Sequence, residues 1–430
     1  MALKLCLHGV DIARPDTFSE DVAARLGLSV VQGRLQEKEY GGNRSARFRR
    51  NRLQGAASLP YRVRTLEGIL LAESHLDSLA DVEISCKPGG EAQALAAVHR
   101  LLSGRDRFVL AEPDMEKRLD LLAGRPFPGV PGDIGRLKAM ERHLAGQVLA
   151  ISRHWHLVYS NPDNRTLARQ LRVRIRRLRS CFSFFREGLP EGPSEDWKRF
   201  FRKEADSLTN LRELDVLIQA CRQRETEGDA SGNGGLLLDR LLQLRREEME
   251  RFYANTDLNA HTEKLAVFLL WLDAVQDVAP KRAGKETMRR FVKRKIDAWC
   301  GKFFELDRAV SDFSDMDELH GLRIRTKRFR YVTQAISPAE FPPDLHRQLK
   351  QLQDVLGLLH DDYVNAVWVR GIATKQPEDA ALQEEVRSFI SWQGARSEAS
   401  LVLVQDLWKQ FLQMLAAYRE APRGTVKNDP

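Results

Sequence analysis

The chain of 430 residues has no hydrophobic run near the ~20 residues that a membrane-spanning helix needs. Its five cysteines are scattered and never form a Cys-x-x-Cys pair, so neither a disulfide framework nor a zinc site is indicated. The N-terminus lacks the apolar stretch and cleavage site of a signal peptide, which predicts a cytoplasmic protein. Phosphate-binding loops, dinucleotide fingerprints, nucleophile elbows and His-Glu-x-x-His motifs are also missing, so we expect no enzyme of those classes.

What the chain does contain is apolar material and charge. Hydrophobic residues make up 43% of it and charged residues 30%, which is enough for a sizeable core. The formal net charge is +8. A modest basic excess indicates an anionic partner only where it is concentrated, and it is concentrated here on two segments.

The character of the chain changes near residue 135. Before it, helical and strand-like patterns alternate, and a stretch rich in proline and glycine, Gly124–Gly132, predicts a linker. We expect strands at Leu3–Ile12, Ser29–Leu35 and Val82–Cys86, and helices at Asp16–Leu26 and Glu91–Leu102. Residues 1–134 are therefore predicted to form a small α/β region of unassigned function.

Beyond residue 135 nearly every segment has a helical pattern, with breaks at proline- and glycine-containing turns. The expected helices are 135–160, 165–187, 195–225, 234–254, 259–278, 285–308, 316–336, 344–371 and 378–419. Successive helices with short connections predict helical bundles, so we expect a mainly α domain over 135–420.

This helical part contains an internal repeat. Arg169–Ser180 aligns without gaps with His320–Tyr331, so that Arg172 corresponds to Arg323, 151 residues later. A second similarity follows each copy, because Asp215 and Asp354 both lie in an Asp-Val-Leu sequence. Two related helical halves, about 135–280 and 281–420, are therefore predicted.

The basic residues of each copy share one stripe of a helix. At about 100° per residue, the first stripe holds Arg169, Arg172, Arg176 and Arg179, and the second holds His320, Arg323, Lys327 and Arg330. A different face carries the apolar residues that we expect to be buried, namely Leu171, Ile175, Leu178, Phe182 and Phe185. Like charges at this spacing cost a few tenths of a kcal/mol per pair, and neither stripe contains an acid that offsets them. The pattern favours a polyanionic ligand, and the guanidinium fork suits phosphate. The alternative is a pair of solvated faces, neutralised internally by Asp215 and Asp354.

These residues also carry a resemblance to a known family. His320-x-x-Arg323-x-x-x-Lys327, followed by Leu349–Gly357, resembles the second half of a CHAD domain, the conserved histidine α-helical domain. Arg172–Arg179, followed by Leu211–Leu217, resembles its first half. The resemblance implies two pseudo-symmetric four-helix-bundle halves. It also implies a basic groove between them that binds inorganic polyphosphate, with no catalysis, cofactor or metal, and an association with cytoplasmic polyphosphate granules.

The same resemblance suggests a role for each residue. The two stripes would form the walls of the groove, Arg212 and Lys350 would support them, and Asp215 and Asp354 would orient the arginines. The chain departs from the family pattern at Arg169, which stands where the first half has its histidine, so a titrating imidazole is missing there. The family's Arg-Asp pair is altered as well, because Glu213 follows Arg212.

Two other functions stay open. Nucleic acid is an alternative ligand for the same basic faces, and the arginine-rich run Asn43–Arg52 either extends an anion-binding surface or is a basic loop. Glu83-x-Ser85-x-Lys87 loosely resembles the Glu-x-Glu-x-Lys opening of CYTH triphosphatases. Ser85 replaces the middle carboxylate, and few residues follow for that family's strands, so a CYTH-like triphosphatase in residues 1–134 is the weaker alternative.

Three further patterns favour structural roles. His154 and His156 point to opposite sides of a helix, which is poor geometry for a metal site. The acids of His360-Asp361-Asp362 are expected to pair with basic neighbours. The aromatic residues at 182, 184, 185, 197, 200 and 201 are expected to belong to the core and not to a base-stacking platform.

Overall fold

The computed structural model describes residues 3–10, 17–122 except 74, 105 and 113, 135–227, 235–278, 286–309, 313, 315–336 and 341–420. The expected linker Gly124–Gly132 lies outside these residues. The chain divides into two compact units, each described separately below. Unit 1 comprises Met1–Leu178, Phe185–Phe201 and Asn255–Glu286, and unit 2 comprises Arg179–Phe184, Arg202–Ala254 and Thr287–Pro430.

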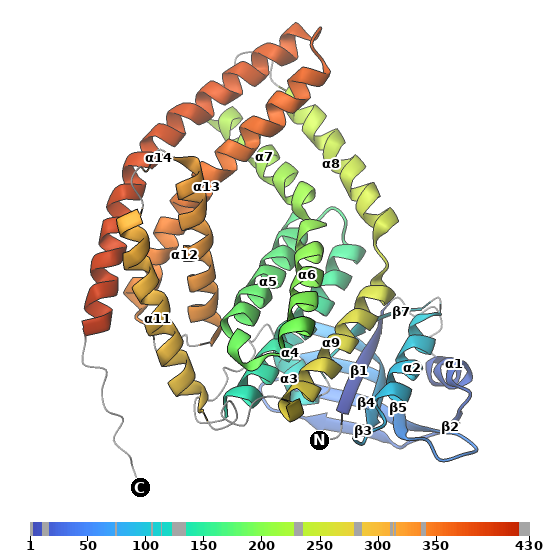
Figure 1. The fold of residues 1–430 in the computed structure, drawn as a ribbon. Helices are drawn as coiled ribbons and strands as arrows, with labels where there is room; N and C mark the ends of the chain where they lie inside the picture. The colour runs from blue at the N-terminus through green and yellow to red at the C-terminus, as the bar shows by residue number, and fades with distance from the viewer. Residues whose placement is uncertain are drawn as a thin grey trace. The chain divides into compact units, whose positions relative to one another are not determined.

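Unit 1 begins with a seven-stranded antiparallel sheet (Figure 1). Its strands are β1 (Leu3–Val10), β2 (Ser29–Val31), β3 (Leu35–Glu39), β4 (Arg44–Gln54), β5 (Tyr61–Ala72), β6 (His75–Cys86) and β7 (Arg107–Leu110). They are ordered β2-β4-β5-β6-β1-β7, and β3 pairs with β4. Most of the sheet therefore precedes Glu83 in the chain.

The N-terminal expectations were only partly correct. The predicted strand Ser29–Leu35 is divided between β2 and β3, and the predicted Val82–Cys86 is the end of the longer β6. The basic run Asn43–Arg52, for which a basic loop was one of the alternatives, falls almost entirely on β4. Its burial alternates along the strand because successive side chains point to opposite faces of the sheet.

Helices cover parts of both sheet faces. The face that carries Tyr61 packs against α1 (Phe18–Leu26) and α2 (Glu91–Leu102), and Arg100 of α2 donates a hydrogen bond to the Tyr61 hydroxyl at 3.1 Å. The opposite face packs at one end against α3 (Met115–Leu122), where Leu119 joins a buried cluster with Phe48. Arg118 of α3 also forms an ion pair there with the buried Asp81.

Polar side chains connect β7 to the helices of unit 1, which are α4 (Arg136–Ser160), α9 (Leu258–Val278) and most of α5 (Arg165–Phe184) and α6 (Glu191–Asp206). The Asn259 side chain accepts from the Phe108 amide at 3.1 Å and donates to the Leu102 carbonyl at 2.8 Å. The Ser152 hydroxyl accepts from the Leu110 amide at 2.8 Å. The backbone at the end of the sheet is thus satisfied by helical residues.

Unit 2 is helical throughout its described part. Its helices are α7 (Thr209–Thr226), α8 (Leu236–Asn255), α11 (Met288–Ala309), α12 (Met316–Ile336), α13 (Pro343–Lys375) and α14 (Ala380–Glu420). A buried hydrophobic cluster is shared by α7, α8, α13 and α14. Two long helices, α13 and α14, form an antiparallel hairpin that Figure 1 shows in orange and red.

The fold is mainly helical with a small N-terminal β region, as the sequence predicted. The bounds of α12 equal the expected 316–336. One expected helix was wrong, because 195–225 is divided into α6 and α7, with a break after Asp206. No proline or glycine marks that break, so the local sequence contains no signal for it.

Candidate functional site

The first predicted stripe lies on α5, and the apolar face of that helix is buried as expected. Its buried residues are Leu171, Ile175, Leu178 and Phe182, and Phe185 beyond the helix end is buried too. Of the four stripe arginines, Arg169 is exposed and Arg172, Arg176 and Arg179 are partly buried. The first three belong to unit 1, and Arg179 to the segment assigned to unit 2.

Two further arginines of α5 lie beside histidines of α4. The Arg174 Nε donates to His154 Nε2 at 3.0 Å. Burial, reinforced by the charge of Arg174, lowers the pKa of His154 to about 4. Burial and the neighbouring Arg177 likewise lower the pKa of His143 to about 4. Both imidazoles are therefore neutral at physiological pH and do not add to the positive charge of α5.

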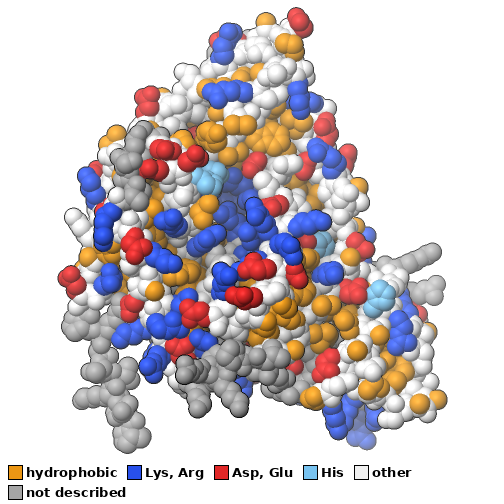
Figure 2. Space-filling view, viewed as in Figure 1, with side chains coloured by type: hydrophobic (Ala, Val, Ile, Leu, Met, Phe, Trp, Pro, Cys, Tyr) orange, Lys and Arg blue, Asp and Glu red, His pale blue; other side chains and the backbone are white. Residues whose placement is uncertain are grey.

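The second predicted stripe lies on α12 in unit 2. His320 is exposed, Lys327 and Arg330 are partly buried, and Arg323 is only 4% exposed. Burial of Arg323 differs from what an open stripe predicts, and it places this guanidinium among side chains of neighbouring helices. The Arg330 Nε is buried and has no hydrogen-bond partner in the described part of the chain. The stripe is accessible at His320, near the N-terminal end of α12. Figure 2 shows Lys and Arg side chains gathered on one face of the molecule.

His320 meets a second histidine that the sequence analysis did not assign to the site. The Nδ1 atoms of His320 and His360 are 3.4 Å apart, and the ring centroids are 5.0 Å apart. Burial, followed by the charge of Arg323, lowers the pKa of His360 to about 3. His360 is therefore neutral at physiological pH and can accept a hydrogen bond from His320.

Arg212 is held by an acid from a different helix. Both oxygens of Asp361 on α13 accept from Arg212 Nη2 of α7, at 2.7 and 2.8 Å. The two side chains are 18% and 22% exposed. The adjacent Glu213 accepts from the Trp368 indole at 2.9 Å. The charge of Arg212 also acts on His360, and part of that charge is compensated by Asp361. The supporting role of Arg212 stays a prediction.

The other predicted supporting residues have different surroundings. Asp215 accepts from Arg245 Nε at 2.7 Å, and Arg245 was not among the predicted residues. Asp354 is exposed, and within the described residues it has no hydrogen bond or ion pair. Lys350 is exposed as well. The roles assigned to these residues stay predictions.

A signal for the missed pair His360 and Asp361 does exist in the sequence. Leu211-Arg212-Glu213 and Leu359-His360-Asp361 share the order leucine, base, acid, and each lies on one of two helices that pack together. The predicted repeat instead aligns the two Asp-Val-Leu segments, which contain Asp215 and Asp354. Only the packing of α7 on α13 shows which of the two similarities brings charged groups together.

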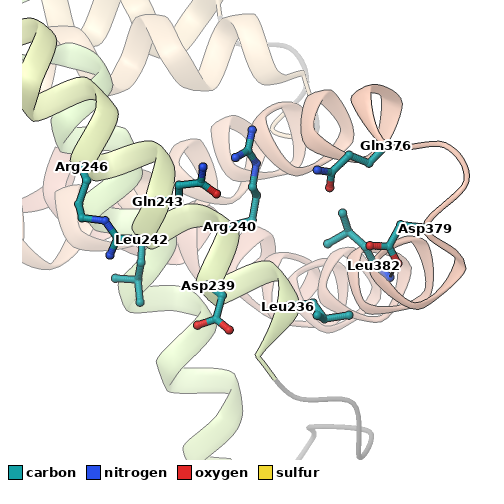
Figure 3. Close-up of a pocket in the computed structure, with 9 residues that line it drawn as sticks. All are labelled: Leu236, Asp239, Arg240, Leu242, Gln243, Arg246, Gln376, Asp379 and Leu382. Carbon is teal, nitrogen blue, oxygen red and sulfur yellow. Dashed lines mark hydrogen bonds between the residues drawn. The ribbon is translucent and has the colours of Figure 1, made fainter.

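Two surface pockets of unit 2 lie apart from the predicted residues. One, of about 600 Å³, is lined by Trp299 and Phe303 of α11 and by Arg325 and Arg328 of α12. The other, of about 400 Å³, is shown in Figure 3 and is formed by α8 and the turn between α13 and α14. Neither of these two pockets contains a residue of the predicted stripes.

The structural roles expected for other patterns are found. His154 pairs with Arg174, Asp361 with Arg212, and Asp362 with Arg396. Of the six aromatic residues, those at 182, 184, 185 and 201 are buried, and those at 197 and 200 are partly buried in ring contacts. All five cysteines lie in the described ranges and are buried, and none of them forms a disulfide. None of the helices in the described ranges combines the length and hydropathy of a membrane span.

Comparison with known proteins adds to this geometry. The family model for the CHAD domain matches residues 142–370. The crystal structure of the CHAD domain from the plant Ricinus communis is 18% identical, with a TM-score of 0.53, and the match covers 66% of this chain and 95% of that chain. PptA from Streptomyces chartreusis is 17% identical, with a TM-score of 0.50, over 64% of this chain and 99% of that chain. No curated protein matches.

Proposed function

Since the chain belongs to the CHAD domain family, a family linked to polyphosphate binding, we propose that it binds inorganic polyphosphate without catalysis. The ligand contacts the basic stripes of α5 and α12, and the protein associates with cytoplasmic polyphosphate granules. The proposal rests on residues of the family-matched region and assigns no catalytic role to any of them.

The observation that carries this proposal is the set of groups that surround the basic stripe of α12. Arg323 and His320 lie beside His360, an imidazole that stays neutral and therefore adds no negative charge to the stripe. Asp361, the residue after His360, binds Arg212. The buried Nε of Arg330 has no acceptor in the described part of the chain. These features support an external anion as the partner of the stripe, because an unsatisfied buried donor is costly.

Binding of this kind depends on salt. A polyphosphate chain carries about one charge per phosphate, and its neutralisation by arginine and lysine releases condensed counterions. With ~6–8 contacts, affinity falls by orders of magnitude between low and moderate salt, by analogy with nucleic acids. Arginine keeps its charge at every physiological pH, so the arginines of the two stripes bind the anion across that whole range.

The test is a salt-titrated polyphosphate binding assay on the double variant Arg172→Glu plus Arg323→Glu. We expect a large loss of affinity and a shallower salt slope, with the fold intact by circular dichroism. Because Arg323 is buried, Arg172→Gln plus Lys327→Gln gives the same comparison with less risk to folding. Arg222→Glu plus Arg370→Glu, at exposed helix positions off the stripes, is the matched control. Equal affinities of the stripe and control variants would refute the proposal.

Two assays separate the alternatives. If single-stranded or duplex nucleic acid displaces long polyphosphate at equal phosphate concentration, nucleic acid becomes the preferred ligand. If the protein releases phosphate from tripolyphosphate above background in the presence of magnesium or manganese, the proposal that it has no catalytic activity is wrong.

A further inference from the structure

The arginines of β4 lie on two opposite faces of the sheet. Because side chains alternate along a strand, Arg50 and Arg52 point to one face of the sheet, and Arg47 and Arg49 point to the other. Arg47 forms an ion pair with Glu37 of β3 at 2.9 Å. The run that looks uniformly basic in the sequence therefore presents two different surfaces, and only one of them gains further arginines from a neighbouring strand.

That neighbour is β5, which adds Arg62 and Arg64. In the antiparallel register Arg52 lies directly opposite Arg64, and Arg62 follows two residues away on the same face. Opposite side chains of such a pair have Cβ atoms about 5 Å apart, and diagonal neighbours lie about 7–8 Å apart. We call Arg50, Arg52, Arg62 and Arg64 the arginine face. It lies outside the family-matched region 142–370.

The arginine face contains more positive charge than its surroundings neutralise. Like charges directly opposite each other destabilise a sheet, as Arg52 and Arg64 do here. Glu83 of β6 lies opposite Arg64 and is 5% exposed, but its carboxylate is 3.1 Å from Lys4 Nζ and 3.9 Å from Arg50. In the described ranges, Arg52, Arg62 and Arg64 have no ion pair or hydrogen bond from their side chains.

The arginine face is also accessible and ready for a ligand. Arg52, Arg62 and Arg64 are exposed, because α3 covers the other end of this face, over Phe48 and Leu66. Arg50 is partly buried, and its Nε has no hydrogen-bond partner among the described residues. A partly buried guanidinium with an unused donor, beside three exposed ones, matches the convergent donors that a phosphate group accepts.

The residues of the arginine face favour inorganic phosphate chains over single-stranded nucleic acid. Single-stranded nucleic acid is bound mainly by stacking its bases on aromatic side chains, in addition to charge. The aromatic residues of β4 and β5, Phe48 and Tyr61, are 1% and 6% exposed, so they offer no platform. We infer that the arginine face is a second binding site for inorganic phosphate chains, independent of the stripes on α5 and α12.

The experiment is calorimetric titration of the full-length chain with short-chain inorganic polyphosphate. The variant Arg52→Glu plus Arg64→Glu is compared with wild type and with the stripe variant Arg172→Gln plus Lys327→Gln. We expect two classes of site in wild type and one in each variant, with affinity at the altered site weakened by about tenfold or more. If wild type has only the site that Arg52→Glu plus Arg64→Glu abolishes, the proposed function is wrong and the inference about the arginine face stands.

The control is Arg49→Glu, which makes one Arg→Glu change at an exposed position of the same strand on the opposite face. We expect it to bind as wild type does. An unchanged number of sites in the Arg52→Glu plus Arg64→Glu variant would overturn the inference, as would an equal loss in the control. If a single-stranded oligonucleotide of equal charge binds this face more tightly than polyphosphate does, the ligand class is wrong. Far-UV circular dichroism shows whether each variant keeps its fold. Arg64→Lys, which keeps the charge, should still bind polyphosphate.

Discussion

The substitution Asp361→Asn tests how the candidate site balances its charges. The Asp361 carboxylate binds Arg212 through both oxygens, next to His360 and the α12 stripe. Removing its negative charge leaves the shape of the side chain almost unchanged. Two effects of opposite sign follow, because the fold loses an ion pair while the ligand site gains net positive charge.

The magnitudes follow from the geometry. Both side chains are about four-fifths buried, so breaking their charge-assisted hydrogen bonds should lower the free energy of unfolding by about 1–3 kcal/mol. For the ligand, one charge about 10 Å from a phosphate is worth ~1–2 kcal/mol at an effective dielectric constant of about 20. We therefore expect polyphosphate to bind about five- to thirtyfold more tightly to Asp361→Asn at low salt. The gain should shrink as salt screens the charge.

The measurements are urea unfolding and polyphosphate binding on the same protein samples. A double-mutant cycle with Arg212→Gln isolates the pair, and we expect a coupling free energy of about 1–2 kcal/mol. Asp354→Asn is the matched control, because it removes an acid from an exposed position of the same helix. If Asp361→Asn binds polyphosphate no better than Asp354→Asn does, the anion does not approach Arg212 and the placement of the site is refuted.

Two predictions concern stability in unit 1. Burial lowers the pKa of His143 to about 4, from 6.5 in the unfolded chain. Between these two pH values the unfolded chain binds more protons than the folded protein does. The stability that is present above about pH 6.5 is therefore lost as the pH falls. Between about pH 7 and pH 4.5 the free energy of unfolding should fall by ~2–3 kcal/mol less in His143→Phe than in wild type, as measured by urea unfolding at each pH. An unchanged pH dependence would contradict the burial of a neutral imidazole. Asp81→Asn removes the carboxylate that forms an ion pair with Arg118, which is only 8% exposed. The free energy of unfolding should therefore fall by about 3–5 kcal/mol. Asp77→Asn, at a partly buried position of β6, should change the free energy of unfolding little.

The helical half of the molecule was largely predictable because its signals are local. The apolar period of 165–187 placed Leu171, Ile175 and Leu178 on one buried face, and the structure confirms it. The bounds of α12 were also predicted correctly, since acids near its start and a proline after its end mark them. The break between α6 and α7 was missed because no residue type signals it.

The sheet was harder to predict for a physical reason. In β4, arginine occupies positions on both faces, so the strand lacks the alternation of apolar and polar residues by which strands are detected. Its identity as a strand comes from pairing with β3 and β5, which are separate segments of the chain. The opposition of Arg52 and Arg64 is a matter of register, which no single segment contains.

The sequence by itself determined the positions of the basic stripes and of the helices that carry them, because both follow from a period of about 3.6 residues along one segment. Tertiary structure alone decided the surroundings of each charge. It joined Arg212 to Asp361 and not to Asp215, placed His360 beside His320, buried Arg323, and gathered four arginines on one sheet face. Ion pairing, desolvation and strand register depend on groups far apart in the chain, and these relations decide which charges remain available to a ligand.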